Sequence, residues 1–321
     1  MIKRLVHTGM DAVMCTMMNA AQWRLRHHAV TSERLNDYLD HCEPLDHRGY
    51  YGLPEELKKR PATVWKRDGN LLSWTSPLQG EHAENNTARA RLHEPEKPEK
   101  APTLILLHAL MSANDLGYRK IAARYNKRGW NVLFPHLPYH YSRTPKKHSN
   151  GSLAITSDLI RNAETLRQSV IELRQLIRWA KRRGSDRVAL LATSYGAWVA
   201  ALTLSLEETD FSILLQPVAD VTHATFGSPA SRRMASLLKK NGVTSSALDR
   251  HAHLTAPGRL TPLTSPERIL VIGGRHDRLS PPASLKTLCS SWGGARYREV
   301  NQGHFGYAAM RAALDEADRY I

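Results

Sequence analysis

The chain has 321 residues, 41% of them hydrophobic, and its seven tryptophans are spread along its length. This composition excludes a wholly disordered chain, which would have too few apolar side chains to form a core. Lys and Arg outnumber Asp and Glu by 45 to 30, a net charge of +15 that attracts anions. The basic residues form short, scattered clusters without interleaved aromatic residues, so we expect no nucleic-acid partner.

The first 60 residues predict a helical extension that ends in a stretch rich in glycine and proline. Apolar residues recur in it at the spacing of one helix face, with basic residues before and after them. This stripe consists of Val6, Met10, Val13, Met14, Met17, Met18 and Ala21. A helix of this kind either packs on the main domain, the commoner case, or lies at a membrane surface, so peripheral membrane contact stays open. The polar residues His7, Asp11 and Asn19 interrupt the stripe, which argues against a signal peptide.

The cysteine content and the apolar runs bear on the compartment. Cys15, Cys42 and Cys289 lie far apart in the sequence, without the spacing of a metal site, and three thiols cannot all pair within one chain. No run of 18 or more apolar residues occurs, so no segment is expected to span a membrane. We expect reduced thiols, no bound metal and a cytoplasmic location. Within that location, association with a membrane through the first helix stays open. The sequence does not indicate an oligomeric state.

From residue 61 to the C-terminus the pattern predicts a single α/β domain. Residues 63–65 and 71–74 flank Asp68-Gly69-Asn70, which is typical of a hairpin turn, and a third strand over 87–92 would complete an antiparallel edge. Five short and nearly unbroken apolar runs follow, which is the pattern of strands buried on both faces of a parallel sheet. They span Thr103–Leu107, Val132–Phe134, Val188–Ala192, Phe211–Leu215 and Ile269–Ile272.

Helices are predicted between these strands. The clearest covers residues 158–183, where apolar residues line one face, polar capping residues precede it and Gly184 stops it. This alternation of strand and helix favours a doubly wound sheet. Residues 221–265 break the alternation, because they are polar, basic and rich in glycine and proline, and the segment is longer than a connection between two strands needs. We therefore predict a lid insertion there.

Ser194 stands where an apolar strand passes into a helix. It follows the run VALLA, precedes AWVAALTLSL and occupies the centre of Ala192-Thr193-Ser194-Tyr195-Gly196. A sharp turn between strand and helix holds its central residue in a strained backbone conformation that projects the side chain, and small neighbours allow the close approach. Gly196 meets that need, whereas Ala192 stands where the G-x-S-x-G pattern has glycine.

With these motifs the chain resembles the α/β-hydrolase superfamily from about residue 61 to the C-terminus, as a serine esterase or lipase-like member. In that superfamily the nucleophile is followed along the chain by an acid and then a histidine. Asp277, in GGRHDRLSPP, resembles the acid that follows a late strand, and His304, in NQGHFG, resembles the histidine of the last loop. Asp220, at the end of FSILLQPVAD, is a reserve for the acid.

The resemblance implies a catalytic triad. His304 would remove the hydroxyl proton of Ser194, which is otherwise a poor nucleophile, and Asp277 would orient the imidazole and stabilise its charged form. Backbone N–H groups of Tyr195 and Leu110 would stabilise the oxyanion. Leu110 lies in His108-Ala109-Leu110-Met111, which is similar to the His-Gly-x-x loop of the family with Ala in place of Gly.

The function that follows is hydrolysis of carboxylic esters through an acyl-enzyme, with no metal or organic cofactor. Two alternatives stay open: acyl transfer by the same triad to an alcohol or amine, and a binding protein that keeps the fold without catalysis. The partner is expected to be a small-molecule or lipid ester. The predicted lid carries several cations, for which two explanations stay open. They bind an anionic portion of that ester, or they are ordinary surface charges in contact with water. These cations are Arg232, Arg233, Lys239, Lys240, Arg250 and Arg259.

Overall fold

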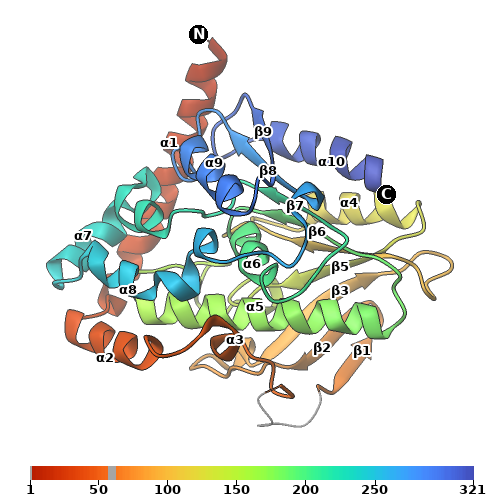
Figure 1. Ribbon diagram of the computed structural model, residues 1–321. Coiled ribbons are helices and arrows are strands. Elements are labelled where there is room, and N and C mark those ends of the chain that lie inside the picture. The colour runs from red at the N-terminus through yellow and green to blue at the C-terminus, as the bar shows by residue number, and fades with distance from the viewer. Residues whose placement is uncertain (1, 57–62) are drawn as a thin grey trace.

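A nine-stranded sheet runs through the part of the chain that the computed structural model describes, residues 2–56 and 63–321 (Figure 1). The strand order is β1-β2-β3-β5-β4-β6-β7-β8-β9. The first three pairs in this order, up to β3 with β5, are antiparallel. All the later pairs, from β5 with β4 onwards, are parallel. The bounds are β1 (Trp65–Asp68), β2 (Leu71–Thr75), β3 (Thr87–His93), β4 (Thr103–Leu107), β5 (Asn131–His136), β6 (Val188–Thr193), β7 (Phe211–Leu215), β8 (Ile269–Gly274) and β9 (Arg296–Val300).

The predicted α/β-hydrolase fold is confirmed by this sheet. Strands β4 and β7 have the predicted bounds, and the other predicted strands are found within a few residues of theirs. The predicted hairpin joins β1 to β2, with Asp68 paired to Leu71 and Gly69 at φ +55°, a conformation that costs glycine no steric strain.

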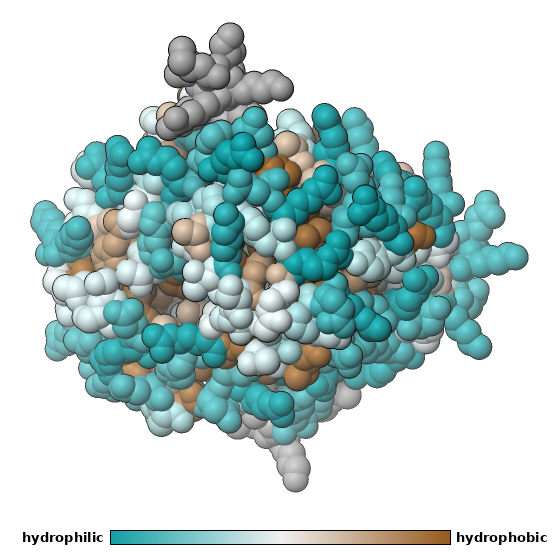
Figure 2. Space-filling model, turned by 45° about the horizontal axis from the view of Figure 1, so that its top comes forward, coloured by the Kyte–Doolittle hydropathy of each residue, from teal (hydrophilic) through white to brown (hydrophobic). Residues whose placement is uncertain are grey.

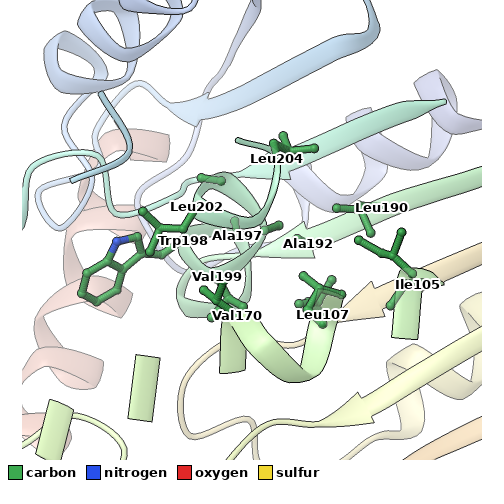
Figure 3. Close-up of a cluster of buried hydrophobic side chains, with 14 of the residues drawn as sticks. Ile105, Leu107, Val170, Leu190, Ala192, Ala197, Trp198, Val199, Leu202 and Leu204 are labelled. Atoms are coloured by element: carbon green, nitrogen blue, oxygen red, sulfur yellow. The ribbon is translucent and has the colours of Figure 1, made fainter. Parts of the chain in front are cut away.

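The apolar runs are continuous because helices cover both faces of the sheet. In β4, Leu104 and Leu106 face one core cluster while Ile105 and Leu107 face the other. The first cluster contains α4 (Leu116–Asn126) and α10 (Ala308–Tyr320), and the second contains α5 (Leu159–Arg182), α6 (Tyr195–Thr203) and α9 (Pro282–Ser291). Figure 3 shows part of the second, where Val170 of α5 and Val199 of α6 lie near Leu107.

Helix α5 matches the predicted helix over 158–183 to within a residue at each end. The Asp158 carboxylate caps it by accepting a hydrogen bond from the Arg161 backbone N–H at 3.2 Å. Gly184, at φ +87°, follows the last turn in the left-handed conformation that commonly ends helices. Fifteen residues of α5 are buried, because this helix packs on the sheet and on the neighbouring helices α2 and α6.

The N-terminal segment forms α1 (Ile2–Arg24), α2 (Ser32–Cys42) and α3 (His47–Tyr50), and the segment predicted as a lid forms α7 (Arg232–Lys240) and α8 (Ser245–Thr255) with short turns between them. These two segments pack on each other, since α1 contacts α7 and α2 contacts α8 (Figure 1). The predicted boundary between residues 60 and 61 lies outside the described residues. All three cysteines are unpaired and buried.

The apolar stripe of α1 divides between two environments. Met10, Met14 and Met18 line a cavity, with Met14 and Met18 half-buried and Met10 more exposed, whereas Val13 and Met17 are exposed and do not line it. On the face shown in Figure 2, hydrophilic side chains predominate, and hydrophobic ones are confined to small separate areas, one of them in a hollow. No helix within residues 2–56 and 63–321 is long and apolar enough to cross a bilayer. Peripheral membrane contact through α1 stays a prediction.

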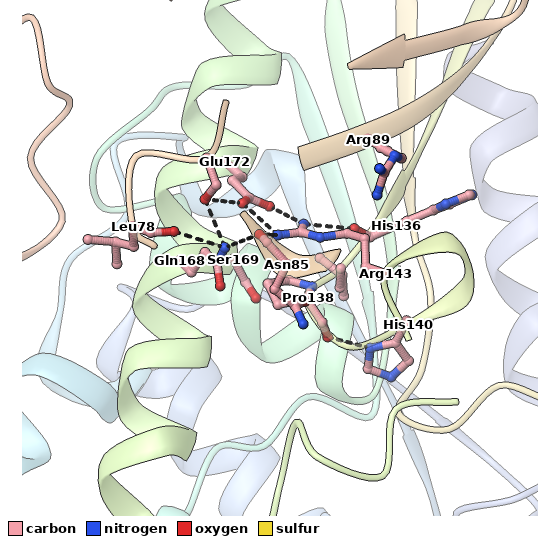
Figure 4. A network of polar contacts seen from close by, with 12 residues as sticks. Leu78, Asn85, Arg89, His136, Pro138, His140, Arg143, Gln168, Ser169 and Glu172 are labelled. Atoms are coloured by element: carbon pink, nitrogen blue, oxygen red, sulfur yellow. Dashed lines mark hydrogen bonds and ion pairs between the residues drawn. The ribbon is translucent and has the colours of Figure 1, made fainter. Parts of the chain in front are cut away.

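A buried ion pair fixes the loop that follows β5 (Figure 4). The Arg143 guanidinium, which has no exposed surface, donates to both Glu172 carboxylate oxygens on α5, at 2.5 and 2.9 Å. It also donates to the carbonyl oxygens of His136 and Asn85, at 3.0 and 2.7 Å. The loop that carries His140 is thereby held against α5, even though it lacks regular secondary structure over most of its length.

Replacing Glu172 by Gln leaves the guanidinium buried without an opposite charge. Removing one partner of a buried ion pair typically costs about 3–5 kcal/mol, so we expect the free energy of unfolding, measured by urea denaturation, to fall by about that amount. The control is Glu299→Gln, which breaks an ion pair with the mostly exposed Arg275 and should cost less than about 1 kcal/mol. Equal losses in the two variants would contradict this account of the loop.

Candidate active site

Ser194 lies at the turn between β6 and α6 with φ +52° and ψ −112°. Residues other than glycine rarely adopt this backbone conformation, so the surrounding packing must hold it. Gly196 permits that packing, because a Cβ on it would come within 2.5 Å of the His108 carbonyl oxygen and 2.8 Å of the Leu107 side chain. Ala192, in place of the usual glycine, is fully buried in the core, where its methyl group is accommodated.

Three residues that are far apart in the sequence meet at the carboxyl edge of the parallel strands. The Ser194 Oγ lies 2.8 Å from the His304 Nε2, and the His304 Nδ1 lies 2.8 Å from the Asp277 Oδ2. Ser194 follows β6, Asp277 follows β8 and His304 follows β9. The structure therefore brings together the three residues that the sequence singled out, in a chain of hydrogen bonds from hydroxyl to imidazole to carboxylate.

The Asp277 carboxylate is held by three further donors. Its Oδ1 accepts the backbone N–H groups of Leu279 and Ser280 at 2.8 and 2.9 Å, and its Oδ2 accepts the Gln216 Nε2 at 2.6 Å. Gln216 follows β7 at φ +49°, and the same side-chain nitrogen donates to the Gly303 carbonyl at 2.9 Å. It thus ties the acid to the loop of the histidine, a role that sequence reasoning missed because a glutamine after a strand carries no signal of its own.

The electrostatic surroundings of His304 favour its charged form. Burial of the ring opposes protonation, but the carboxylate of Asp277 and, further away, that of Asp11 outweigh it and raise the pKa of His304 above its ordinary value. The ring is therefore a stronger base than a histidine in water, and Asp277 fixes its orientation.

Two residues that line the cavity with Ser194 have backbone N–H groups without a partner in the described part of the chain. Leu110 and Tyr195 both line it, and neither of their N–H groups has a hydrogen-bond partner among the residues that the structure describes. The N–H groups on either side of Leu110 are already used, that of Ala109 by the Tyr118 hydroxyl and that of Met111 by a histidine nitrogen. Of the three residues of the 108–111 loop that line the cavity, Leu110 is thus the one whose N–H group has no partner among the described residues.

The histidine that accepts the Met111 N–H is His140, from the loop that the Arg143 ion pair holds in place. Burial lowers the pKa of His140 to about 4, so the ring is neutral at physiological pH. Its Nδ1 donates to the Pro138 carbonyl at 2.8 Å, which leaves Nε2 as the acceptor for the Met111 N–H at 3.2 Å. No local pattern in the sequence signals this role of His140, which supports the backbone next to Leu110.

A cavity of about 480 Å³ opens beside Ser194. Its walls come from α1, α2, α5, α8 and the segment 221–234, and no Lys, Arg, Asp or Glu lines it in the described part of the chain. Its volume lies within the usual range for small-molecule sites, about 300–1,000 Å³. The apolar wall residues distant from Ser194 in the sequence include Met14, Met18, Leu35, Leu39, Leu159, Leu166, Met234 and Leu248.

Other polar residues singled out in the sequence lie elsewhere. Asp220, the reserve acid, is exposed and accepts the His223 backbone N–H at 2.8 Å. None of the six cations of the 221–265 segment lines the cavity. Arg250 pairs with Asp40 of α2 and with Glu43 directly after that helix, and the Arg233 guanidinium lies 4.3 Å from the centre of the Trp23 ring. These two contacts connect the segment to the N-terminal helices instead of facing a ligand. No group of three or more His, Cys, Asp or Glu side chains within residues 2–56 and 63–321 is arranged to hold a metal ion.

A family model matches the larger part of this chain. The model of the family described as alpha/beta hydrolase domain containing 18 matches residues 66–242, more than half of the chain, including Ser194 but not Asp277 or His304. No curated protein sequence matches.

The solved structures that match share the fold at low identity. An acetyl xylan esterase from Paenibacillus sp. R4 is 12% identical, with a TM-score of 0.59 over 92% of this chain and 98% of that one. Acetyl xylan esterase 1 from Thermoanaerobacterium sp. JW/SL YS485 is 16% identical, with a TM-score of 0.55 over 92% of this chain and 96% of that one. A puromycin-hydrolyzing peptidase from Mycobacterium tuberculosis is 13% identical, with a TM-score of 0.52 over 71% of this chain and 36% of that one.

Proposed function

Since this chain belongs to the family of alpha/beta hydrolase domain containing 18, we propose that it is a serine esterase that works through an acyl-enzyme, with Ser194, His304 and Asp277 as its catalytic triad. The observation that carries the proposal is the continuous hydrogen-bonded chain from the Ser194 hydroxyl through His304 to Asp277, at 2.8 Å in each step. It lies at the mouth of a cavity large enough for a substrate.

In the first half of the reaction the Ser194 Oγ attacks the carbonyl carbon of the ester while its proton passes to the His304 Nε2. The carbonyl oxygen becomes an oxyanion, which the backbone N–H groups of Leu110 and Tyr195 stabilise. His304 then gives its proton to the departing alcohol oxygen as the carbon–oxygen bond breaks, and the acyl group stays on Ser194.

In the second half, His304 removes a proton from water, and the resulting hydroxide attacks the acyl-enzyme. The proton returns to the Ser194 Oγ, and the free acid leaves. An acyltransferase would differ only in the acceptor, an alcohol or amine in place of water.

The cavity supports an ester with a long, uncharged acyl chain, such as that of a lipid. Its walls are mostly apolar and include no Lys, Arg, Asp or Glu in the described residues, so each methylene group placed there contributes about 0.8 kcal/mol of hydrophobic stabilisation. The cations of the 221–265 segment do not face it, and this argues against an anionic group next to the reacting carbonyl.

Replacing Ser194 by Ala tests the proposal directly. The native protein should react covalently with a fluorophosphonate probe and hydrolyse p-nitrophenyl esters, whereas Ser194→Ala should do neither, because the attacking oxygen is gone. Intact mass spectrometry measures the labelling. If residue 194 of the native protein is not labelled, the result supports the non-catalytic alternative. If little free acid forms when an alcohol or amine is added, the result supports acyl transfer.

The raised pKa of His304 predicts the pH dependence. The reaction needs the neutral imidazole, so kcat/KM should be constant at higher pH and fall as the pH drops through the pKa of His304. Because Asp277 and Asp11 raise that pKa, the acidic limb should lie above 6.5, the ordinary value. A limb below 6.5, measured with a p-nitrophenyl ester across a pH series, would show that burial outweighs the two carboxylates.

A substitution within the cavity tests the acyl chain. Ala247 of α8 lines it beside α2, so Ala247→Phe should lower kcat/KM for a decanoyl ester about tenfold or more and leave that for an acetyl ester nearly unchanged. The matched control is Ser246→Phe, one residue earlier on the same helix, whose side chain is exposed. If both esters respond equally to Ala247→Phe, the acyl chain does not occupy this part of the cavity.

A further inference from the structure

A carboxylate of the N-terminal helix contacts the loop that presents His304. Asp11 of α1 is 6% exposed, and its Oδ2 and Oδ1 accept the backbone N–H groups of His304 and Phe305 at 2.9 and 3.1 Å. The two segments are 293 residues apart in the sequence. A buried carboxylate costs several kcal/mol unless hydrogen bonds compensate it, so its presence here needs the two donors.

The loop is shaped to admit this carboxylate. A side chain on Gly303 would overlap the Asp11 carboxylate, and Gly303 does not have a positive φ, so glycine is needed here for the close approach and not for its conformational freedom. The peptide group that follows Gly303 carries the N–H donated by His304. The contact therefore depends on a missing side chain on one partner and a short charged side chain on the other.

Further hydrogen bonds fix α1 where it presents Asp11. The Asn19 side chain donates to the Pro229 carbonyl at 2.9 Å and accepts the Arg233 backbone N–H at 2.8 Å. One turn further on, the Gln22 side chain donates to the Ile155 carbonyl at 2.6 Å. Because these anchors lie on the same face of α1, the helix is held to the domain along its length and not only at Asp11.

We propose that Asp11 is a positioning residue of the active site, which fixes the His304 loop through two backbone hydrogen bonds and stabilises the charged imidazole that forms during attack. This rests on the proposed esterase function. It assigns α1, which lies outside the segment that matches the family model, to the catalytic unit.

The charges around His304 determine whether its pKa rises or falls when the charge of Asp11 is removed. Asp277 faces the ring from the loop after β8, and Asp11 faces its backbone from α1. Cys15, one turn along α1, stays a neutral thiol because burial, with a smaller contribution from Asp11, raises its pKa. Arg278 and Arg232, the cations that act on Cys15, are both exposed. Removing the negative charge of Asp11 therefore removes one of the causes that raise the pKa of His304, and that pKa should fall.

The test is Asp11→Asn, which keeps the size of the side chain. In the native protein the two N–H groups reach different carboxylate oxygens, so in the variant one of them keeps an oxygen acceptor and the other faces the NH₂ group. Because small misplacement of a catalytic group can cost up to about a hundredfold in rate, we expect kcat for a p-nitrophenyl ester to fall about tenfold or more. KM should change little, since Asp11 does not line the cavity. The acidic limb of kcat/KM should move to lower pH.

The matched control is Asn19→Ala, which weakens an anchor of α1 without touching the His304 loop. It should lower the melting temperature without moving the acidic limb. An equal fall in kcat in both variants, or an unmoved acidic limb in Asp11→Asn, would overturn the proposal and leave Asp11 as a stabilising contact only.

An NMR titration of the His304 imidazole in native protein and in Asp11→Asn gives a reading that does not depend on catalysis. The proposal expects a lower pKa in the variant, and an unchanged pKa overturns it. Fluorophosphonate labelling of native Ser194 separates the two levels of inference: absence of labelling refutes the esterase, whereas labelling of native protein and Asp11→Asn at the same rate refutes only the role of Asp11.

Discussion

The close approach of Gly196 to the end of β4 is the constraint on which the rest of the site depends. The Gly196 N–H donates to the His108 carbonyl at 3.1 Å, and any side chain at residue 196 would overlap that oxygen. This contact presses the first turn of α6 against the 108–111 loop. It keeps Ser194 in its strained conformation, beside a cavity that Tyr195 and Leu110 also line. Strain at one residue is thus maintained by packing at its neighbours, as the general behaviour of functional sites leads one to expect.

The buried polar side chains around Ser194 serve mainly to position backbone groups of the neighbouring loops. Arg143 and Glu172 hold the loop of His140, His140 accepts the Met111 N–H, and the adjacent Leu110 N–H stays free. On the opposite side, Gln216 joins Asp277 to the carbonyl of Gly303, next to His304. Each side of the site therefore has a neutral or paired side chain that fixes the backbone in a mostly apolar setting, where an unpaired polar group would be costly. Preorganisation of this kind is what stabilisation of an oxyanion requires.

The sequence predicted the parts of the site that follow from chain-local patterns. The strand runs, the turn at Ser194 and the strand-end positions of Asp277 and His304 all follow from short-range rules, and the structure places the three side chains together. Gln216 was missed because its role arises from pairing with two loops that only the folded sheet brings near. The role of Arg143 was missed as well, because its side chain is fully buried against Glu172 of α5, a contact that no local pattern encodes.

Asp11 is the most instructive of these cases, because sequence reasoning treated it as an interruption of an apolar stripe. In the structure the exposed members of that stripe include Val13 and Met17, while Asp11 and Cys15 are buried. A lone carboxylate on the buried side of an apolar helix is costly unless donors await it, so its position was itself a signal that α1 meets unpaired N–H groups.

The position of Asp11 also relates the substrate cavity to the base. Met14 and Met18, which line the cavity, lie one and two turns from Asp11 on the same helix. A helix moves as a nearly rigid body over such a distance, because its backbone hydrogen bonds fix one turn to the next. Under the proposed function, a displacement of α1 that widens the cavity around an acyl chain would also move the carboxylate that contacts the His304 loop. Binding of the acyl chain and orientation of the proposed base would then be coupled through the N-terminal helix, although this helix is far from Ser194 in the sequence.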